Sequence, residues 1–193
     1  ENNCRISNRI LMKITLAGSP GSGKSTLRRQ IAERYGLVTK GTGEFMRDLS
    51  VKFGYSDITK FLVEYVSVHP EVDRQVDEEQ RIFGKENEDF VLDAHLGFHF
   101  VPDSIRIRLI CDLEEAARRI LNDSDRTAEE PKNIRSSMDA SKKRRETMRK
   151  NFMNLYQVDI DEYSNFDFVL DTTALSSEEV FERVSSFIDL QIA

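Results

Sequence analysis

Short apolar segments alternate with amphipathic helical patterns along this chain. The clearest apolar segment covers residues 14–17. After a glycine-rich turn, Leu27, Ile31 and Tyr35 recur every four residues and predict a helix that ends at Gly36. Four further apolar runs are predicted to be strands, and they cover residues 37–39, 90–93, 105–111 and 166–170. Strands that alternate with helices predict an α/β fold, a five-stranded parallel sheet with helices on both faces.

Two polar helical stretches interrupt this alternation. They cover residues 44–85 and 122–150, and we expect both to lie over the carboxyl edge of the sheet. Residues 118–150 hold 11 basic and 6 acidic side chains, so this part of the chain is locally basic. A solvated helix face would carry such charges too. The pattern predicts one domain over residues 12–193, preceded by a polar extension over residues 1–11.

Composition and charge restrict the classes of function. The 28 basic and 34 acidic residues give a net charge of −6, which argues against a protein that coats nucleic acid. The two cysteines, Cys4 and Cys111, support neither a disulfide framework nor a cysteine-based metal site. The apolar runs are far shorter than the roughly 20 residues that span a bilayer. We therefore expect a cytoplasmic protein without a membrane anchor.

The strongest motif is a phosphate-binding loop. Residues 18–25 read Gly-Ser-Pro-Gly-Ser-Gly-Lys-Ser, a complete G-x-x-x-x-G-K-[ST] between a predicted strand and a predicted helix. Lys24 is expected to reach the β- and γ-phosphates of ATP, and the Ser25 hydroxyl to ligate Mg²⁺. The predicted nucleotide-binding residues of this loop are Gly18, Ser19, Pro20, Gly21, Ser22, Gly23, Lys24, Ser25 and Thr26.

A carboxylate near the metal completes such a site. Asp93 follows the apolar run of residues 90–92 and is predicted to be the second Mg²⁺ ligand and a catalytic residue, although it could instead cap a turn. No segment matches the N-K-x-D pattern of a guanine reader. A small-molecule kinase therefore fits better than a GTPase.

Arginines elsewhere could meet further phosphate groups. Thr42, Gly43 and Arg47 follow the second predicted strand and suit the phosphate of an acceptor, because guanidinium grips phosphate oxygens bidentately. Arg118 and Arg119 lie two helical turns after the fourth predicted strand, and Arg119 is predicted to join Lys24 in catalysis. Further candidates in the basic stretch are Arg126, Arg135, Arg144 and Arg145.

Taken together, these residues resemble the nucleoside monophosphate kinases, and among them the short cytidylate kinases of archaea and some bacteria. Beyond the phosphate-binding loop, the resemblance rests on residues 41–47, 72–80 and 158–173. It implies an acceptor-binding insert at about residues 42–85 and a lid at about residues 122–145. It also implies a monomer that uses Mg²⁺ and ATP, with Thr173 beside the adenine, and CMP or dCMP as the acceptor.

The chain departs from that family at three positions. His95 stands where the family has an arginine that faces the acceptor, Asp123 replaces a second lid arginine, and Asn151 replaces a basic residue. If His95 faces the acceptor, we expect weak CMP binding that improves below about pH 6.5 as the ring gains charge. Three alternatives stay open: a kinase of AMP or of a small metabolite, an RNA-associated ATPase, and a nucleotide-binding module without catalysis.

Overall fold

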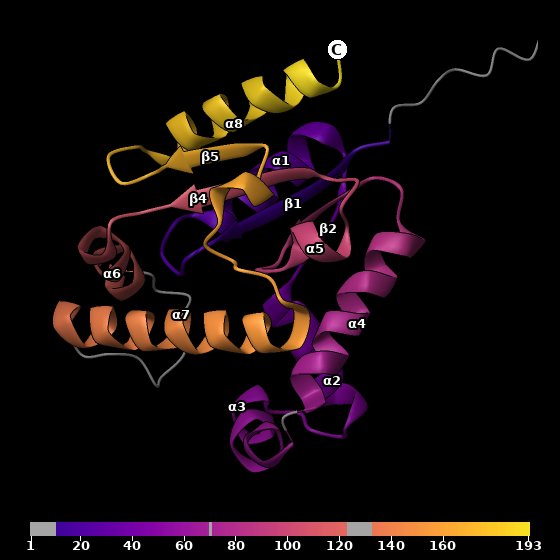
Figure 1. The fold of residues 1–193 in the computed structure, drawn as a ribbon, viewed down its shortest axis with the longest axis vertical. Helices are drawn as coiled ribbons and strands as arrows, with labels where there is room; N and C mark the ends of the chain where they lie inside the picture. The colour runs from indigo at the N-terminus through magenta and orange to yellow at the C-terminus, as the bar shows by residue number, and fades with distance from the viewer. Residues whose placement is uncertain (1–10, 70, 123–132) are drawn as a thin grey trace, which may run out of the picture.

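The computed structural model describes residues 11–69, 71–122 and 133–193 (Figure 1). Its centre is a five-stranded sheet in the order β2-β3-β1-β4-β5, and every pairing is parallel. The strands are β1 Lys13–Gly18, β2 Val38–Gly41, β3 Phe90–Asp93, β4 Ile105–Ile110 and β5 Phe168–Asp171. This confirms the predicted sheet, with β2 and β5 displaced by one or two residues toward the carboxyl end. Because the strands are parallel, all five carboxyl ends meet at one edge.

One face of the sheet is covered by α1 (Lys24–Tyr35) and α8 (Ser177–Gln191). Apolar side chains from both helices pack against β1 and β4, and Ile31, Val184 and Ile188 among them are inaccessible to solvent. Burial of each such side chain contributes about 1.5–3 kcal/mol. A capping box begins α8, since Glu179 N donates to Ser176 Oγ and Ser176 N donates to the Glu179 carboxylate. These contacts hold the phosphate-binding helix α1 firmly on the sheet.

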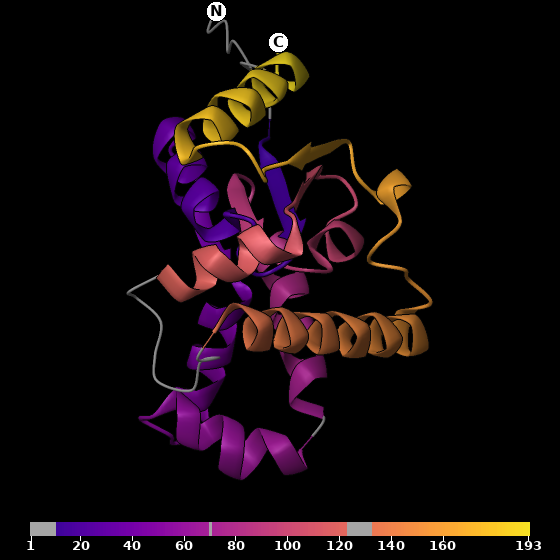
Figure 2. The ribbon, with the colours of Figure 1, turned by 90° about the vertical axis from the view of Figure 1, so that its left-hand side faces the viewer.

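The other face carries α5 (Gly97–Phe100) and the helices between β2 and β3. Those helices are α2 Thr42–Lys52, α3 Ile58–Lys60 and α4 Glu71–Glu86, with a π-helical turn at Phe61–Tyr65 and a 3-10 turn at Val66–Val68. Phe61 is fully buried and stacks on Tyr65 with a centroid separation of 5.6 Å. Together, α2, α3 and α4 form a lobe that projects from the carboxyl edge at the lower end of both views (Figure 1, Figure 2).

The second polar stretch forms α6 (Leu113–Asn122) and the long helix α7 (Ile134–Tyr156). In both views α7 crosses between the sheet and the α2–α4 lobe (Figure 2). The side chain of Asn133 caps α7 by accepting a hydrogen bond from Ser136 N at 2.9 Å. Asp123 and Arg126 lie outside the described residues. A short 3-10 turn at Tyr163–Asn165 then leads into β5.

Candidate functional site

The loop that joins β1 to α1 wraps around a space at the carboxyl edge of the sheet. Gly18, Gly21 and Gly23 have φ angles of 145°, 79° and 91°, which only glycine adopts at low cost. A Cβ added to Gly21 would also lie 2.5 Å from the carbonyl oxygen of Ala116. The glycines of the motif therefore allow the backbone to form a tight loop directly before the amino end of α1. Such an end attracts anions.

Lys24, Ser25 and Asp93 meet at this edge because β1 and β3 are neighbours, with Leu16 paired to Asp93. The Ser25 hydroxyl donates to Asp93 Oδ2 at 3.4 Å, and Lys24 Nζ donates to the Ser19 carbonyl at 3.1 Å. A hydroxyl and a carboxylate this close offer hard oxygen ligands of the kind that Mg²⁺ prefers. Among the described residues no cluster of three His, Cys, Asp or Glu side chains could hold a metal. The donor set fits a magnesium ion that takes its remaining ligands from phosphates and water.

A large open cavity extends from this loop along α1. Its wall includes residues 20–26 of the loop and helix, Arg47 of α2, Arg119 of α6 and Leu175 after β5. Lys24 and the exposed side chain of Arg47 thus line one cavity, although 23 positions separate them in the sequence. The α2 helix is tied to this edge, because Thr42 Oγ1 donates to the carbonyl of Asp93 at 3.2 Å and Arg28 of α1 binds Glu44. Gly43 lies in the first turn of α2, next to Arg47.

The guanidinium of Arg119 lies against the loop after β5. It donates to the carbonyls of Thr172 at 2.7 Å and Thr173 at 3.2 Å, and its Nε binds Glu115 at 2.9 Å. Thr172 is fully buried and donates to the carbonyl of Ser22 at 3.2 Å, which joins this loop to the phosphate-binding loop. In this structure Arg119 is therefore part of the cavity wall. To reach a phosphoryl group, it would have to leave these carbonyls.

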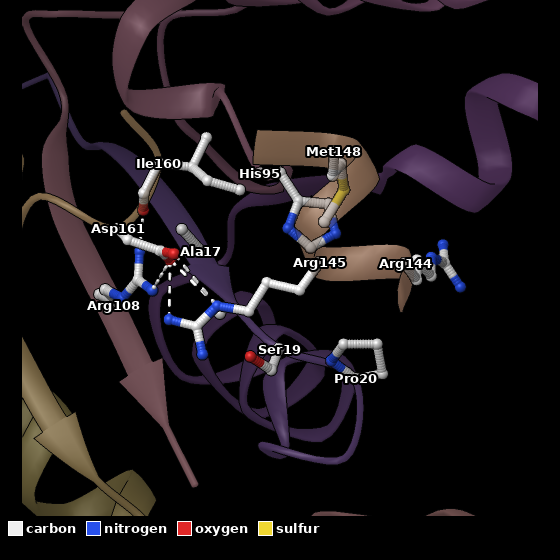
Figure 3. Close-up of a pocket in the computed structure, with 11 residues that line it drawn as sticks. Ala17, Ser19, Pro20, His95, Arg108, Arg144, Arg145, Met148, Ile160 and Asp161 are labelled. Atoms are coloured by element: carbon white, nitrogen blue, oxygen red, sulfur yellow. Dashed lines mark hydrogen bonds and ion pairs between the residues drawn. The ribbon is translucent and has the colours of Figure 1, made fainter. Parts of the chain in front are cut away.

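His95 lines a second, smaller cavity between the phosphate-binding loop and α7 (Figure 3). Burial, together with the nearby positive charges of Lys24, Arg144 and Arg108, lowers the pKa of its imidazole to about 3. The ring is therefore neutral at every pH above about 4. The expectation that His95 gains charge below pH 6.5 is wrong, because burial and the positive charges of Lys24, Arg144 and Arg108 all disfavour protonation of the ring.

The low pKa of His95 predicts a measurable loss of stability in acid. Between about pH 6.5 and pH 3 the unfolded chain binds a proton at His95 and the folded chain does not, so the free energy of unfolding falls as the pH falls. At pH 5 this amounts to at most about 2 kcal/mol relative to pH 7.5. Urea unfolding of the wild type and of His95→Gln at both pH values measures it. We expect a smaller acid loss in His95→Gln, and equal losses would contradict the assignment.

Sequence reasoning missed two members of the smaller cavity, Arg108 and Asp161. Arg108 lies in β4, which reads Ile-Arg-Ile-Arg-Leu-Ile, and its neighbours Ile107 and Leu109 point to the opposite face. This alternation places Arg106 and Arg108 on one face of the sheet, and it was the available signal. Of the other candidates, Arg144 and Arg145 lie beside this cavity, whereas Arg135 is exposed in the first turn of α7.

Four features define this fold as a P-loop nucleotide-binding fold. They are the strand β1, the glycine-rich loop that ends in Lys24 and Ser25, the helix α1 that follows the loop, and the carboxylate of Asp93 on the adjacent strand. The comparisons agree with this class. A family profile described as an AAA domain matches residues 14–160.

Proteins with similar sequences indicate which family of P-loop proteins this chain belongs to. The cytidylate kinase of Pyrococcus horikoshii is 32% identical over 91% of this chain and 88% of its own length, and that of Archaeoglobus fulgidus is 26% identical over 93% and 96%. The chain therefore belongs to the P-loop nucleoside monophosphate kinase family that includes the archaeal cytidylate kinases. An S-adenosylmethionine-dependent nucleotide dehydratase of Lacinutrix mariniflava is 33% identical over 89% of this chain, which spans only 35% of that protein.

Solved structures with this fold include shikimate kinases. That of Bacteroides thetaiotaomicron has a TM-score of 0.64 at 16% identity, covering 92% of this chain and 98% of the other. That of Acinetobacter baumannii, in complex with shikimate, has a TM-score of 0.59 at 15% identity, covering 94% and 96%. At such low identity the likeness supports the fold alone. None of the helices in the described parts of the chain is long and apolar enough to cross a membrane.

Proposed function

We propose that this protein transfers the γ-phosphoryl group of Mg²⁺-bound ATP to a nucleoside monophosphate, and that the acceptor is CMP or dCMP. The observation that carries the proposal is the single cavity that Lys24 and Arg47 share. A cation from the P-loop and a cation from α2 then line one space, as binding of a donor phosphate and an acceptor phosphate requires. The choice of CMP or dCMP as the acceptor rests on the cytidylate kinases among the similar proteins.

Each element has a role in this proposal. The loop and Thr26 hold the ATP phosphates, Thr173 and its neighbours border the adenine, and Ser25 and Asp93 hold Mg²⁺. That ion supplies charge neutralisation on the phosphates when bound. Thr42, Gly43, Arg47 and His95 form the acceptor side, with residues 42–85 as the acceptor-binding insert and residues 122–145 as the lid. The neutral His95 acts there as a hydrogen-bonding group.

The relatives bear on the acceptor in two ways. The dehydratase acts, by its name, on a nucleotide, and about a third of that protein resembles this chain, which supports a nucleotide acceptor. The shikimate kinases share the fold and act on a different metabolite, so an acceptor such as AMP or a small alcohol is the alternative to test. The acidic net charge disfavours the RNA-associated ATPase.

An acceptor panel tests the proposal. Purified protein with Mg²⁺ and ATP is mixed with CMP, dCMP, UMP, AMP, GMP, shikimate or buffer alone, and ADP and the phosphorylated acceptor are quantified. We expect ADP to form with CMP or dCMP at least about tenfold faster than with any other addition, a difference of about 1.4 kcal/mol. Equal ADP formation in buffer alone would indicate an ATPase. No ADP with any addition would indicate a non-catalytic module.

A further inference from the structure

A nearly enclosed guanidinium joins the helix that follows the P-loop to the first turn of α2. Arg28 lies one turn after Lys24 on α1, and only 13% of its side chain is exposed. Its Nη1 donates to Glu44 Oε2, whereas its buried Nε has no hydrogen-bond partner among the described residues. An enclosed charge is costly unless it is paired. Glu44 therefore both holds this guanidinium and compensates its charge.

Glu44 also binds the end of β2. It is the third residue of α2, and the oxygen that meets Arg28 accepts a hydrogen bond from Gly41 N at 2.7 Å. A Cβ on Gly41 would lie 2.9 Å from Arg28 Nη1 and 3.3 Å from Glu44 Oε2. The φ angle of Gly41 is −129°, which any residue adopts. The glycine at this position therefore provides space for the ion pair and is not required by the backbone conformation.

The position of Arg47 depends on this first turn of α2. Glu44 and Arg47 are three residues apart, so they are neighbours on the surface of the helix. Arg47 Nη1 lies 3.8 Å from the point where Gly43 would carry a Cβ, which places the guanidinium over the first turn. Lys24, Arg28 and Arg47 all line the large cavity. A shift of the first turn relative to α1 would therefore move Arg47 relative to Lys24.

We propose that Arg28 and Glu44 are positioning residues, and that their ion pair aligns an acceptor phosphate held by Arg47 with the ATP phosphates held by the P-loop. The inference rests on the proposed phosphoryl transfer. In that step an acceptor phosphate oxygen bonds to the γ-phosphorus while the bond from this phosphorus to the β,γ-bridging oxygen breaks. The bonding electron pair leaves with ADP.

Alignment is the property on which this reaction depends most. The attacking oxygen and the leaving oxygen must lie roughly in line with the phosphorus. A misplacement of about 1 Å can lower the rate about 100-fold. A direct bond between α1 and α2 limits such misplacement, because each helix carries one of the two cations, Lys24 and Arg47. Loss of the pair should therefore slow the transfer more than it weakens the binding of either substrate.

Three variants disturb the pair in different ways. Arg28→Ala removes the guanidinium. Glu44→Gln removes the negative charge but keeps an oxygen that can accept from Gly41 N, because glutamine also serves at this helix position. Gly41→Ala keeps both charged groups. It should displace the flexible end of Arg28 from Glu44, since the added Cβ would lie only 2.9 Å from Nη1.

Asp48→Asn is the comparison variant for all three. Asp48 lies one turn after Glu44 on α2, and its carboxylate pairs with Lys40 Nζ of β2 at 2.5 Å. Its side chain is 63% exposed and does not line the cavity. Asp48→Asn therefore removes an ion pair between α2 and the sheet but leaves the bond between α2 and α1 intact.

Steady-state kinetics with the best acceptor of the panel test the proposal, with melting temperatures to verify folding. We expect kcat to fall about 30-fold in Arg28→Ala and about tenfold in Glu44→Gln and Gly41→Ala, with both KM values within about threefold. The double variant Arg28→Ala/Glu44→Gln should match Arg28→Ala, because the same interaction is lost only once. Asp48→Asn should keep kcat within about twofold of the wild type.

The other outcomes of these kinetics each count against the proposal. A lower melting temperature with unchanged kcat would show that the pair serves stability alone. A rise in one KM with unchanged kcat would show that Arg28 contacts that substrate. An equal loss of kcat in Asp48→Asn would show that any weakening of α2 has the same effect. Each result would overturn the positioning role.

A distance measurement does not depend on the acceptor. Nitroxide labels are attached at Glu33→Cys on α1 and Val51→Cys on α2, both exposed positions, in a chain whose two natural cysteines are replaced by serine. Pulsed electron spin resonance should give a distance distribution at least about twofold broader in Arg28→Ala and unchanged in Asp48→Asn. Failure of every acceptor in the panel would refute the proposed function and leave this result intact. An unchanged distribution in Arg28→Ala would refute the positioning role.

Discussion

Lys24→Ala is expected to lower kcat/KM for phosphoryl transfer at least about 1,000-fold while the fold is retained. In the structure Lys24 Nζ donates to the Ser19 carbonyl at 3.1 Å, so the ammonium group is already directed over the loop where phosphates would bind. Phosphoryl transfer depends almost entirely on positioning and charge stabilisation, and the lysine supplies the positive charge at the β- and γ-phosphates. Transfer from ATP to the best acceptor of the panel measures the effect.

Lys13→Ala is the matched control for Lys24→Ala. Lys13 lies at the start of β1, at the end of the strand opposite the loop, and its Nζ pairs with Asp103 at 2.8 Å. We expect its removal to leave turnover within about twofold, because a surface ion pair contributes little to stability. Circular dichroism verifies the fold of both variants. Residual activity in Lys24→Ala within about tenfold of the wild type would remove Lys24 from the assigned role.

The P-loop and the order of the strands and helices could be predicted from the sequence. Both depend on local features, namely glycines at positions of positive φ, a lysine and serine at fixed spacing, and runs of apolar residues. The bounds of β2 and β5 were less accurate because pairing with a neighbour decides where a strand ends. Gly41 pairs with Asp93 and Asp171 with Ile110, so each strand extends past its own apolar run.

The parts of the site that sequence reasoning missed depend on contacts between distant segments. In the sequence, Arg108 is one of two arginines that alternate with apolar residues in β4, and Asp161 is a loop aspartate; only the fold brings them together. The neutral state of His95 likewise arises from enclosure and from cations on three different elements. The carbonyls that hold Arg119 belong to a loop 53 residues further along the chain. No local pattern in the sequence reports these neighbours.

Arg47→Ala is expected to raise KM for the acceptor at least about 30-fold and to change KM for ATP less than about threefold. Arg47 lies one turn into α2, and its exposed side chain lines the cavity that residues of α1 also line. Loss of a bidentate contact between guanidinium and phosphate should cost about 2–4 kcal/mol of transition-state binding. Because the P-loop holds the ATP phosphates without Arg47, only the binding of the acceptor should become weaker.

The contrast between the two KM values is the decisive measurement. Lys52→Ala in the last turn of α2 is the control, because Lys52 is exposed, pairs only distantly with Glu79 at 3.6 Å and does not line the cavity. We expect both constants of Lys52→Ala to stay within about twofold of the wild type. If Arg47→Ala instead raised both KM values by the same factor, Arg47 would be acting on the shape of the whole cavity, and the acceptor phosphate would have to be bound by another cation.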